Sequence, residues 1–397
     1  MKESIPVAIY VKEFLPLSQT FVYRQLKGVA PEFKPAVICK FRNNEDIYPY
    51  EEVIHRNDPL ESSLFQFLRV IKGYNDSASI FNYIFWKNVL KKKKCRMIHA
   101  HFGPNGITIA PLAEALGIPL IVTFHGYCIS KLTRNKSYLA KLKKLFNKAA
   151  LIITASEKFR KDAVELGCPL EKTVTHYIGV PVEQFKFRER VLSPNMPVIF
   201  LQVSNFVEKK GHVYTLQAFK KVLDANYNCR LRFVGDGETK ANCKRLCGEL
   251  GIADYVEFLG SRPMNEIPQI MDEADVFVHH SVTASDGNTE ATTLTIAEAM
   301  SSGMPVLSTW HGGIPEEVED GKSGFLVEER DVDAYAAKWI ELLSNPSLIT
   351  EMGIFNRKRT EENFNLVKQN KKLKEIYRTV LEKHGQAGKI EPLNAKK

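Results

Sequence analysis

The chain of 397 residues carries 55 Lys and Arg against 46 Asp and Glu, and 44% of its residues are hydrophobic. These ordinary globular values exclude collagen, mucins, extended coiled coils and wholesale disorder, and the length favours two domains. No stretch offers about 18 uninterrupted apolar residues or a signal-peptide layout, and seven scattered cysteines suit a reducing compartment, so we expect a soluble, cytoplasmic protein.

Strand-like runs alternate with helical patterns through the first half of the chain, which indicates a parallel sheet built from βαβ units. The runs are apolar on both faces, and this favours a sheet that helices cover on both sides. The predicted strands are residues 5–11, 35–41, 97–102, 119–125, 151–156 and 173–178.

Residues 60–94 break the alternation, because aromatic residues stand there beside basic ones and the segment ends in Lys91–Lys94. One interpretation is a pair of helices with buried aromatic side chains and a solvated lysine end. The other is a basic, aromatic surface for a membrane or a lipid-linked acceptor. The run 131–150 is also open to two interpretations, a docked helix with a solvated basic face or a membrane-binding surface. Leucines recur in it at helical spacing, with lysines between them.

Positive charge is concentrated in the first half of the chain. Residues 1–190 hold 30 Lys and Arg against 17 Asp and Glu, whereas the remainder holds 25 against 29. We therefore expect the first half to meet an anionic partner, with a membrane surface, a phosphorylated acceptor and nucleic acid as the candidates.

A stretch of charges and turn residues, 179–197, predicts an interdomain linker, after which a second βα series begins. We expect two doubly wound, Rossmann-like α/β domains, 1–190 and 191–365, that face each other across a cleft. A final amphipathic helix, 366–384, is expected to pack back on the first domain. The strands predicted for the second domain are residues 197–204, 229–235, 255–260, 275–280, 305–309 and 324–328.

Two carboxylates with seven residues between them, Glu290 and Glu298, form the strongest functional pattern. The strand 275–280 leads into a loop that contains Glu290, and Glu298 follows about two turns into the next helix. A helix start beyond the carboxyl end of a parallel strand binds anions through free N–H groups and the helix dipole. A carboxylate beside such a site can accept hydrogen bonds from the hydroxyls of a sugar or a ribose.

The segment TEATTLTIAEAMSSGMPVLSTWHGGIPEEVEDGKSGFLV resembles the E-x7-E region of retaining glycosyltransferases of family four, which have the GT-B fold. The opening EFLPLSQTFVYRQL is similar to bacterial exopolysaccharide transferases of the colanic-acid type. Further matches follow in the family's order, at residues 98–104, 123–126, 204–211, 234–237 and 258–263.

The resemblance implies donor-binding roles in the second domain. Glu298 matches the glutamate that binds the ribose hydroxyls, Glu290 the one that faces the transferred sugar, and Lys210 the lysine at the diphosphate. The main chain around Arg262 would read the base, and Gly235 lies on a loop beside the diphosphate. Backbone N–H groups that would hold the diphosphate at the helix start are those of Thr292, Thr293 and Leu294.

In the first domain the resemblance places His125 by the anomeric centre and Ser18 on the diphosphate from the opposite side. One departure stands out: Asn205 occupies the position of a family arginine and supplies hydrogen bonds without charge. A substitute cation is then expected, with Lys209 and a first-domain arginine as candidates. Between two further histidines, we expect one to face the cleft and favour His101 over His99.

The chemistry agrees with this reading, since negative charge builds on a departing diphosphate and cations with N–H groups can stabilise it without a metal. We expect no cofactor and no metal, and take Asp331 as a helix cap. We predict that the protein transfers a sugar from a UDP- or GDP-sugar to a glycan or lipid-linked acceptor. The reaction would take place at the inner face of the membrane, in the biosynthesis of a cell-surface polysaccharide. A non-catalytic nucleotide-sugar binder or partner subunit is the alternative.

Two other functions are disfavoured. A dehydrogenase would need a Gly-x-Gly-x-x-Gly turn after the first strand, where Leu15–Ser18 stands instead. No nucleic-acid-binding module accompanies the basic half, so no nucleic acid is expected as partner. A zinc site at Cys243 and Cys247 lacks a neighbouring histidine, and packed thiols are the better interpretation.

Overall fold

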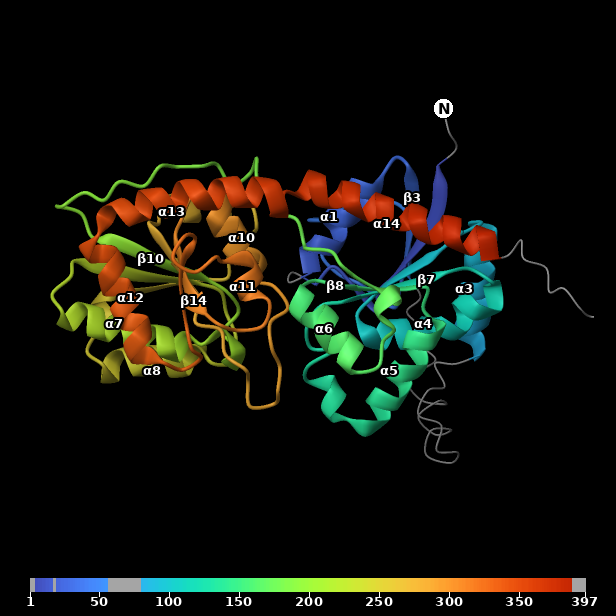
Figure 1. Cartoon of the computed structure of the whole chain (residues 1–397), viewed down its shortest axis with the longest axis horizontal. Coiled ribbons are helices and arrows are strands. Elements are labelled where there is room, and N and C mark those ends of the chain that lie inside the picture. Colours follow the sequence, from blue (N-terminus) through green and yellow to red (C-terminus); the bar gives the residue numbers. More distant parts are fainter. Residues whose placement is uncertain (1–3, 17–18, 56–79, 388–397) are drawn as a thin grey trace, which may run out of the picture.

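The computed structural model describes residues 4–16, 19–55 and 80–387, and it contains two parallel sheets in two domains (Figure 1). In spatial order, the first sheet consists of β5 (Val53–His55), β3 (Phe33–Cys39), β1 (Ile5–Tyr10), β6 (Ile98–His101), β7 (Leu120–Phe124), β8 (Leu151–Thr154) and β9 (Thr173–Thr175). The second consists of β12 (Val256–Gly260), β11 (Cys229–Val234), β10 (Val198–Val203), β13 (Val276–Val278), β14 (Val306–Thr309) and β15 (Gly324–Val327).

Helices cover both sheets, as the apolar strands require. The first-domain helices are α1 (Thr20–Val29), α3 (Ile80–Lys92), α4 (Gly103–Leu116), α5 (Lys136–Lys148) and α6 (Glu157–Glu165). The second-domain helices are α7 (His212–Asp224), α8 (Lys240–Glu249), α9 (Ile267–Asp272), α10 (Leu294–Ser301), α11 (Ile314–Glu317), α12 (Val332–Ser344) and α13 (Pro346–Arg359). No helix among the described residues is long and apolar enough to cross a membrane.

All twelve predicted strands have a counterpart in these sheets, so the doubly wound α/β prediction is confirmed. The edge strand β5 was not predicted, and neither was the small sheet of β2 (Glu13–Phe14) and β4 (Phe41–Arg42). These segments are only two or three residues long, too short for a period of two to be visible. All seven cysteines are free and buried, and Cys243 and Cys247 are therefore packed thiols, as predicted for that pair.

Strand order reverses once in each sheet, between β1 and β6 and between β10 and β13. Crevices outside the carboxyl ends of the strands form at such switch points and bind ligands in α/β proteins. In the first domain this position receives the ends of β6 and β7. In the second it receives the turn after β10 and the loop after β13. These four segments carry most of the predicted site.

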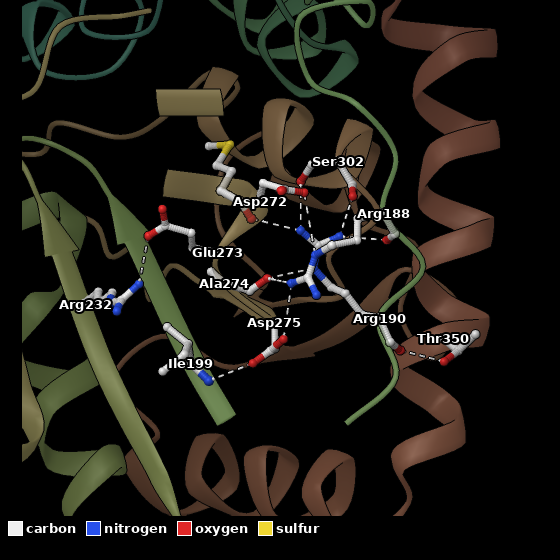
Figure 2. Close-up of polar contacts among 11 residues, drawn as sticks. Arg188, Arg190, Ile199, Arg232, Asp272, Glu273, Ala274, Asp275, Ser302 and Thr350 are labelled. Carbon is white, nitrogen blue, oxygen red and sulfur yellow. Dashed lines mark hydrogen bonds and ion pairs between the residues drawn. The ribbon is translucent and has the colours of Figure 1, made fainter. Parts of the chain in front are cut away.

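The linker is fixed to the second domain by a buried arginine (Figure 2). Arg190 donates hydrogen bonds to the backbone oxygens of Met271, Ala274 and Ser302, at the carboxyl ends of α9 and α10. Such ends have carbonyls without intrahelical partners and a partial negative charge, which a guanidinium satisfies. Burial lowers the pKa of Arg190 to about 10, so the group stays charged at neutral pH.

The linker therefore joins the second domain before the predicted boundary at residue 190. Phe185 is buried in the core of the second domain, five residues ahead of Arg190. The chain crosses between domains near Val180, whose N–H and carbonyl bond the backbone of Phe364 and Leu366. Both crossings of the chain thus lie side by side and form one paired connection.

The predicted helix 366–384 corresponds to α14 (Leu366–Ala387), which runs along the first domain (Figure 1). Its Tyr377 packs edge-on against Phe33, with ring centroids 5.1 Å apart. Arg378 forms a bidentate ion pair with Glu32. The C-terminal helix thereby contributes to the core of the first domain.

Candidate active site

A cavity of about 1520 Å³ lies between the two domains at the carboxyl ends of their strands. Its wall contains nine of the residues predicted for the site: His125, Asn205, Lys210, Gly235, Arg262, Thr292, Thr293, Leu294 and Glu298. Glu290 lies directly behind the wall, in contact with Lys210. Ser18, predicted to reach the diphosphate, lies outside the described residues.

Glu290 is held by two lysines of the second domain. Its Oε1 lies 2.8 Å from Lys210 Nζ and 3.1 Å from Lys209 Nζ. Burial alone would raise the pKa of this carboxyl, but the lysine charges outweigh burial and hold the pKa below its usual range. Glu290 therefore remains an ionised hydrogen-bond acceptor, and the cluster keeps a net positive charge toward the cavity.

A tight turn aims both lysines at Glu290. Residues Glu208–Lys210 form a single 3-10 turn that ends at Gly211, whose φ is +61°. A Cβ at Gly211 would lie 1.7 Å from the carbonyl oxygen of His280, so only glycine fits this turn. Gln202 fixes the turn from below by donating to the Lys210 carbonyl at 2.8 Å.

Glu298 projects from α10 and pairs with a residue of the other domain. Arg24 Nη1, from α1, lies 3.4 Å from Glu298 Oε1. Burial raises the pKa of Glu298 to about 7, and the Arg24 charge opposes this shift. The pair joins residues 274 positions apart, so no spacing in the sequence could reveal it.

One of the three backbone N–H groups predicted to bind a diphosphate at the start of α10, that of Thr293, already has a partner. Thr293 N–H already donates to Glu317 Oε2 at 2.9 Å, so it is not free for a phosphate as the structure stands. Glu317 is buried on α11, where burial raises its pKa to about 8. Glu317 was not predicted from the sequence. It directly follows Glu316, and two adjacent glutamates normally indicate a solvated surface.

His125 directly follows β7 and belongs to the first-domain wall of the cavity. Its Nε2 is 3.0 Å from His101 Nδ1, and the two rings stack with centroids 5.3 Å apart. Its buried Nδ1 has no hydrogen-bond partner within the described part of the chain. Burial lowers the pKa of both histidines, that of His101 to about 3. His125 is thus a neutral ring at the cavity whose second nitrogen is buried and unpartnered in the described part of the chain.

The expectation that one of His99 and His101 faces the cleft, with His101 favoured, was wrong, because both side chains are buried and neither lines the cavity. Side chains alternate across a strand with a period of two, so residues two apart share a face. The two rings are adjacent, with centroids 4.4 Å apart. His99 bonds Tyr377 of α14 at 2.6 Å and Thr123 at 2.7 Å, so it supports His101 from behind.

Gly235 and Arg262, also predicted for the site, line the cavity on the side of the second domain. Gly235 has φ +137°, and a Cβ there would lie 2.0 Å from the Ser204 carbonyl oxygen, so glycine lets the chain turn at the wall. The Arg262 side chain folds back on its own loop, where Nε donates to the Leu259 carbonyl at 3.0 Å. The cap prediction for Asp331 is confirmed, since its carboxylate accepts from Ala334 N–H.

Additional polar contacts join the domains outside the cavity. Glu316 of α11 accepts from the N–H groups of Glu157 and Lys158, at the free start of α6, and from the Tyr177 hydroxyl. Lys131 pairs with Asp286 at 2.6 Å. Among the described residues, no three metal-binding side chains gather in one place.

Comparison with known families matches the chain in two blocks. Residues 183–359 match the family described as glycosyl transferases group 1, and residues 44–184 match the family described as glycosyltransferase family 4. The junction of the two blocks lies at residue 183, between the chain crossing at Val180 and the buried Phe185.

Curated relatives and solved structures agree with this match. A Salmonella typhimurium protein provisionally named as the colanic acid biosynthesis glycosyltransferase WcaL is 34% identical over 289 residues, covering 71% of this chain and 70% of that protein. The amylovoran biosynthesis glycosyltransferase AmsK of Erwinia amylovora is 31% identical, covering 67% and 65%. The Anabaena protein HepE, solved in complex with UDP, superimposes over 95% of this chain with a TM-score of 0.76 and 18% identity.

Proposed function

Because the chain belongs to glycosyltransferase family 4, we propose that it moves a sugar from a nucleotide-sugar donor to an acceptor. Its fold is GT-B, as the sequence predicted. The donor is a UDP- or GDP-sugar, and the anomeric configuration is retained. The acceptor is a glycan or lipid-linked sugar of a cell-surface polysaccharide, by analogy with relatives named for colanic acid and amylovoran synthesis.

The observation that carries this proposal is the pairing of Lys209 and Lys210 with Glu290 beside the cavity. A departing nucleoside diphosphate needs positive charge where its own charge develops. Two lysines on one carboxylate leave a net positive charge that a diphosphate can share. Preorganised groups of this kind are worth about 100- to 1,000-fold in rate for each donor.

Each wall then has a separate task. Glu298, buried beside the cavity, accepts the ribose hydroxyls, and the loop at Arg262 binds the base through its main chain. Glu290 accepts hydroxyls of the transferred sugar while it orients the lysines. His125 faces the sugar from the first-domain side of the cavity. Lys209 and Lys210 bind the phosphates directly, so we propose that transfer needs no metal ion.

The first domain is proposed to bind the acceptor at an anionic membrane surface. On α5, Leu142, Leu145 and Phe146 are buried in the core, so this helix is docked and its lysines lie on the exposed face. On α3, Trp86 is buried likewise. The described residues therefore support attachment through charge rather than through inserted aromatic side chains, while residues 60–79 lie outside the described part.

Product formation from a panel of labelled nucleotide sugars, with detergent-solubilised lipid-linked acceptors, tests the proposal. We expect transfer from one UDP- or GDP-sugar, unchanged by EDTA, and its loss in Glu290→Ala. Nucleotide binding without any transfer, across the whole panel, would favour the non-catalytic alternative.

A further inference from the structure

Arg24 brings the guanidinium of one domain to the buried carboxylate of the other. Its side chain is 12% exposed and that of Glu298 is 1% exposed, with 3.4 Å between Nη1 and Oε1. Arg24 also lines the central cavity, so the contact lies inside the cleft rather than at its rim. A guanidinium keeps its charge in proteins at any ordinary pH, and a nearly buried one needs an anionic partner.

Arg24 and a bound donor would compete for the Glu298 carboxylate. On the function proposed above, Glu298 accepts the ribose hydroxyls, whereas Arg24 now occupies its Oε1. The contact is long for a charge-assisted hydrogen bond, which is usually about 2.7–2.9 Å, so it can be exchanged. When Glu298 turns to the ribose, Arg24 requires another anion, and the donor brings one in its diphosphate.

The position of α1 puts that diphosphate within the reach of Arg24. Phe21, three residues before Arg24 and one helical turn away, packs on His125 with ring centroids 4.6 Å apart. One face of α1 therefore extends from the histidine at the proposed sugar site to the glutamate at the proposed ribose site. The diphosphate joins sugar and ribose in every nucleotide sugar, so it must pass along this face.

The second-domain wall does not itself supply a guanidinium for the diphosphate. Asn205 lines the cavity near Lys210 and carries no charge. Lys209 and Lys210 share their charge with Glu290 at 3.1 Å and 2.8 Å. A guanidinium also forms two parallel hydrogen bonds to a phosphate, which an ammonium cannot do.

We propose that Arg24 is a donor-binding residue that leaves Glu298 when the nucleotide sugar enters and binds a diphosphate oxygen from the first domain. It holds the empty ribose site closed and then clamps the donor. Entry of the donor is thereby linked to contact between the two domains. This assignment rests on the proposed function.

Calorimetry with a graded series of ligands separates this role from a structural one. The wild type is first titrated with UDP, GDP and ADP, and the preferred base is then used as nucleoside, monophosphate and diphosphate. Arg24→Ala should weaken diphosphate binding about 10- to 100-fold, the usual effect of one charged hydrogen bond. Nucleoside binding should stay the same or tighten, because the competitor for Glu298 is gone.

Two further variants keep the test interpretable. Arg24→Lys retains the charge without the fork and should recover part of the lost diphosphate affinity. Asp286→Asn removes a different ion pair between the domains, outside the cavity, and should leave all three affinities unchanged. Thermal melts establish that each variant is folded.

The possible failures are distinct. Equal losses for nucleoside and diphosphate in Arg24→Ala would overturn the assignment, since Arg24 would then act only through Glu298. Unchanged diphosphate binding would overturn it as well, while leaving the proposed function intact. If the wild type bound none of the three diphosphates, the proposed function would fail, and the Arg24 assignment would fail with it.

Discussion

The two walls of the cleft are built in different ways. The second-domain wall takes Glu290 and Glu298 from one loop and helix, and Lys209 and Lys210 from one turn. The first-domain wall combines residues of α1 with His125, and behind His125 lie His101, His99 and Tyr377 of the C-terminal helix. Chemistry encoded in local spacing can be predicted from sequence, whereas chemistry assembled by tertiary contacts cannot.

The walls differ in charge as well. Ionised groups dominate the second, with two lysines against Glu290, whereas the described first-domain wall offers the neutral His125 and Arg24. We infer that the second wall stabilises the departing diphosphate and the first orients the sugar and acceptor. Variants in the two walls should therefore change different kinetic quantities.

The largest expected effect is on the second wall. Lys210→Ala should lower the transfer rate about 100- to 1,000-fold, because a preorganised cation at the leaving group is lost. Lys209→Ala serves as matched control: it removes a lysine that is more exposed and farther from Glu290, so its loss should be smaller. Near-normal single-turnover rates in Lys210→Ala would contradict the assignment.

Glu298→Ala should produce the next largest effect, a loss of nucleotide affinity of about 10- to 100-fold, since the ribose loses a charged acceptor. Glu290→Ala and His125→Ala should instead lower turnover more than affinity, because both face the transferred sugar. Calorimetry with the nucleoside diphosphate, beside steady-state rates, separates these outcomes. UDP and GDP binding untouched in Glu298→Ala would place the ribose elsewhere.

A pH profile sharpens the contrast between the walls. The pKa of Glu298 is raised to about 7, so the carboxyl is protonated below that pH and cannot accept from both ribose hydroxyls. Donor affinity should therefore rise about tenfold per pH unit up to about 7 and level off above it. Glu298→Gln should have a lower affinity and a flat profile up to about pH 7, above which Glu317, whose pKa is raised to about 8, begins to titrate.

The donor itself must not titrate in this experiment. A nucleotide sugar is suitable, since a free terminal phosphate loses a proton near pH 6. The first-wall histidines stay neutral over this range, because burial lowers the pKa of His101 to about 3 and that of His125 well below its usual value. A pH dependence below about pH 7 that persists in Glu298→Gln would identify a different titrating group.

The smallest effect per side chain is expected at the membrane. Changing Lys91–Lys94 to Gln should weaken binding to anionic vesicles, each lysine near the surface contributing about 1 kcal/mol. About 0.5 M salt should release the wild type. The matched control changes Lys220, Lys221, Lys240 and Lys244 to Gln, which removes the same charge from the second domain. Equal binding to neutral and anionic vesicles would exclude attachment by charge.

The division between local and tertiary information explains what the sequence could predict. Long apolar strands and the E-x7-E spacing lie within a few turns of chain, so the fold and the position of Glu290 and Glu298 followed from pattern and resemblance. Arg24, which meets Glu298 from the other domain, left no such pattern. Glu317 was missed for the same reason, because its burial and its bond to Thr293 depend on how α11 packs.

The linker shows a related limit. Its charges and turn residues predicted an interdomain linker over 179–197 with the domain boundary at residue 190, yet Arg190 is buried and donates to three carbonyls of the second domain. An arginine among polar residues is normally solvated, and only the unpaired helix ends beneath it explain its burial.

Analysis of the reaction products by NMR tests the central claim most directly. With the preferred nucleotide sugar and its acceptor, we predict one nucleoside diphosphate released per transfer and the donor's anomeric configuration kept in the product. Lys210→Ala should form almost none of that product under the same conditions. An inverted anomeric centre, or equal product from the Lys210→Ala variant, would contradict a retaining transferase whose second-domain lysines stabilise the leaving diphosphate.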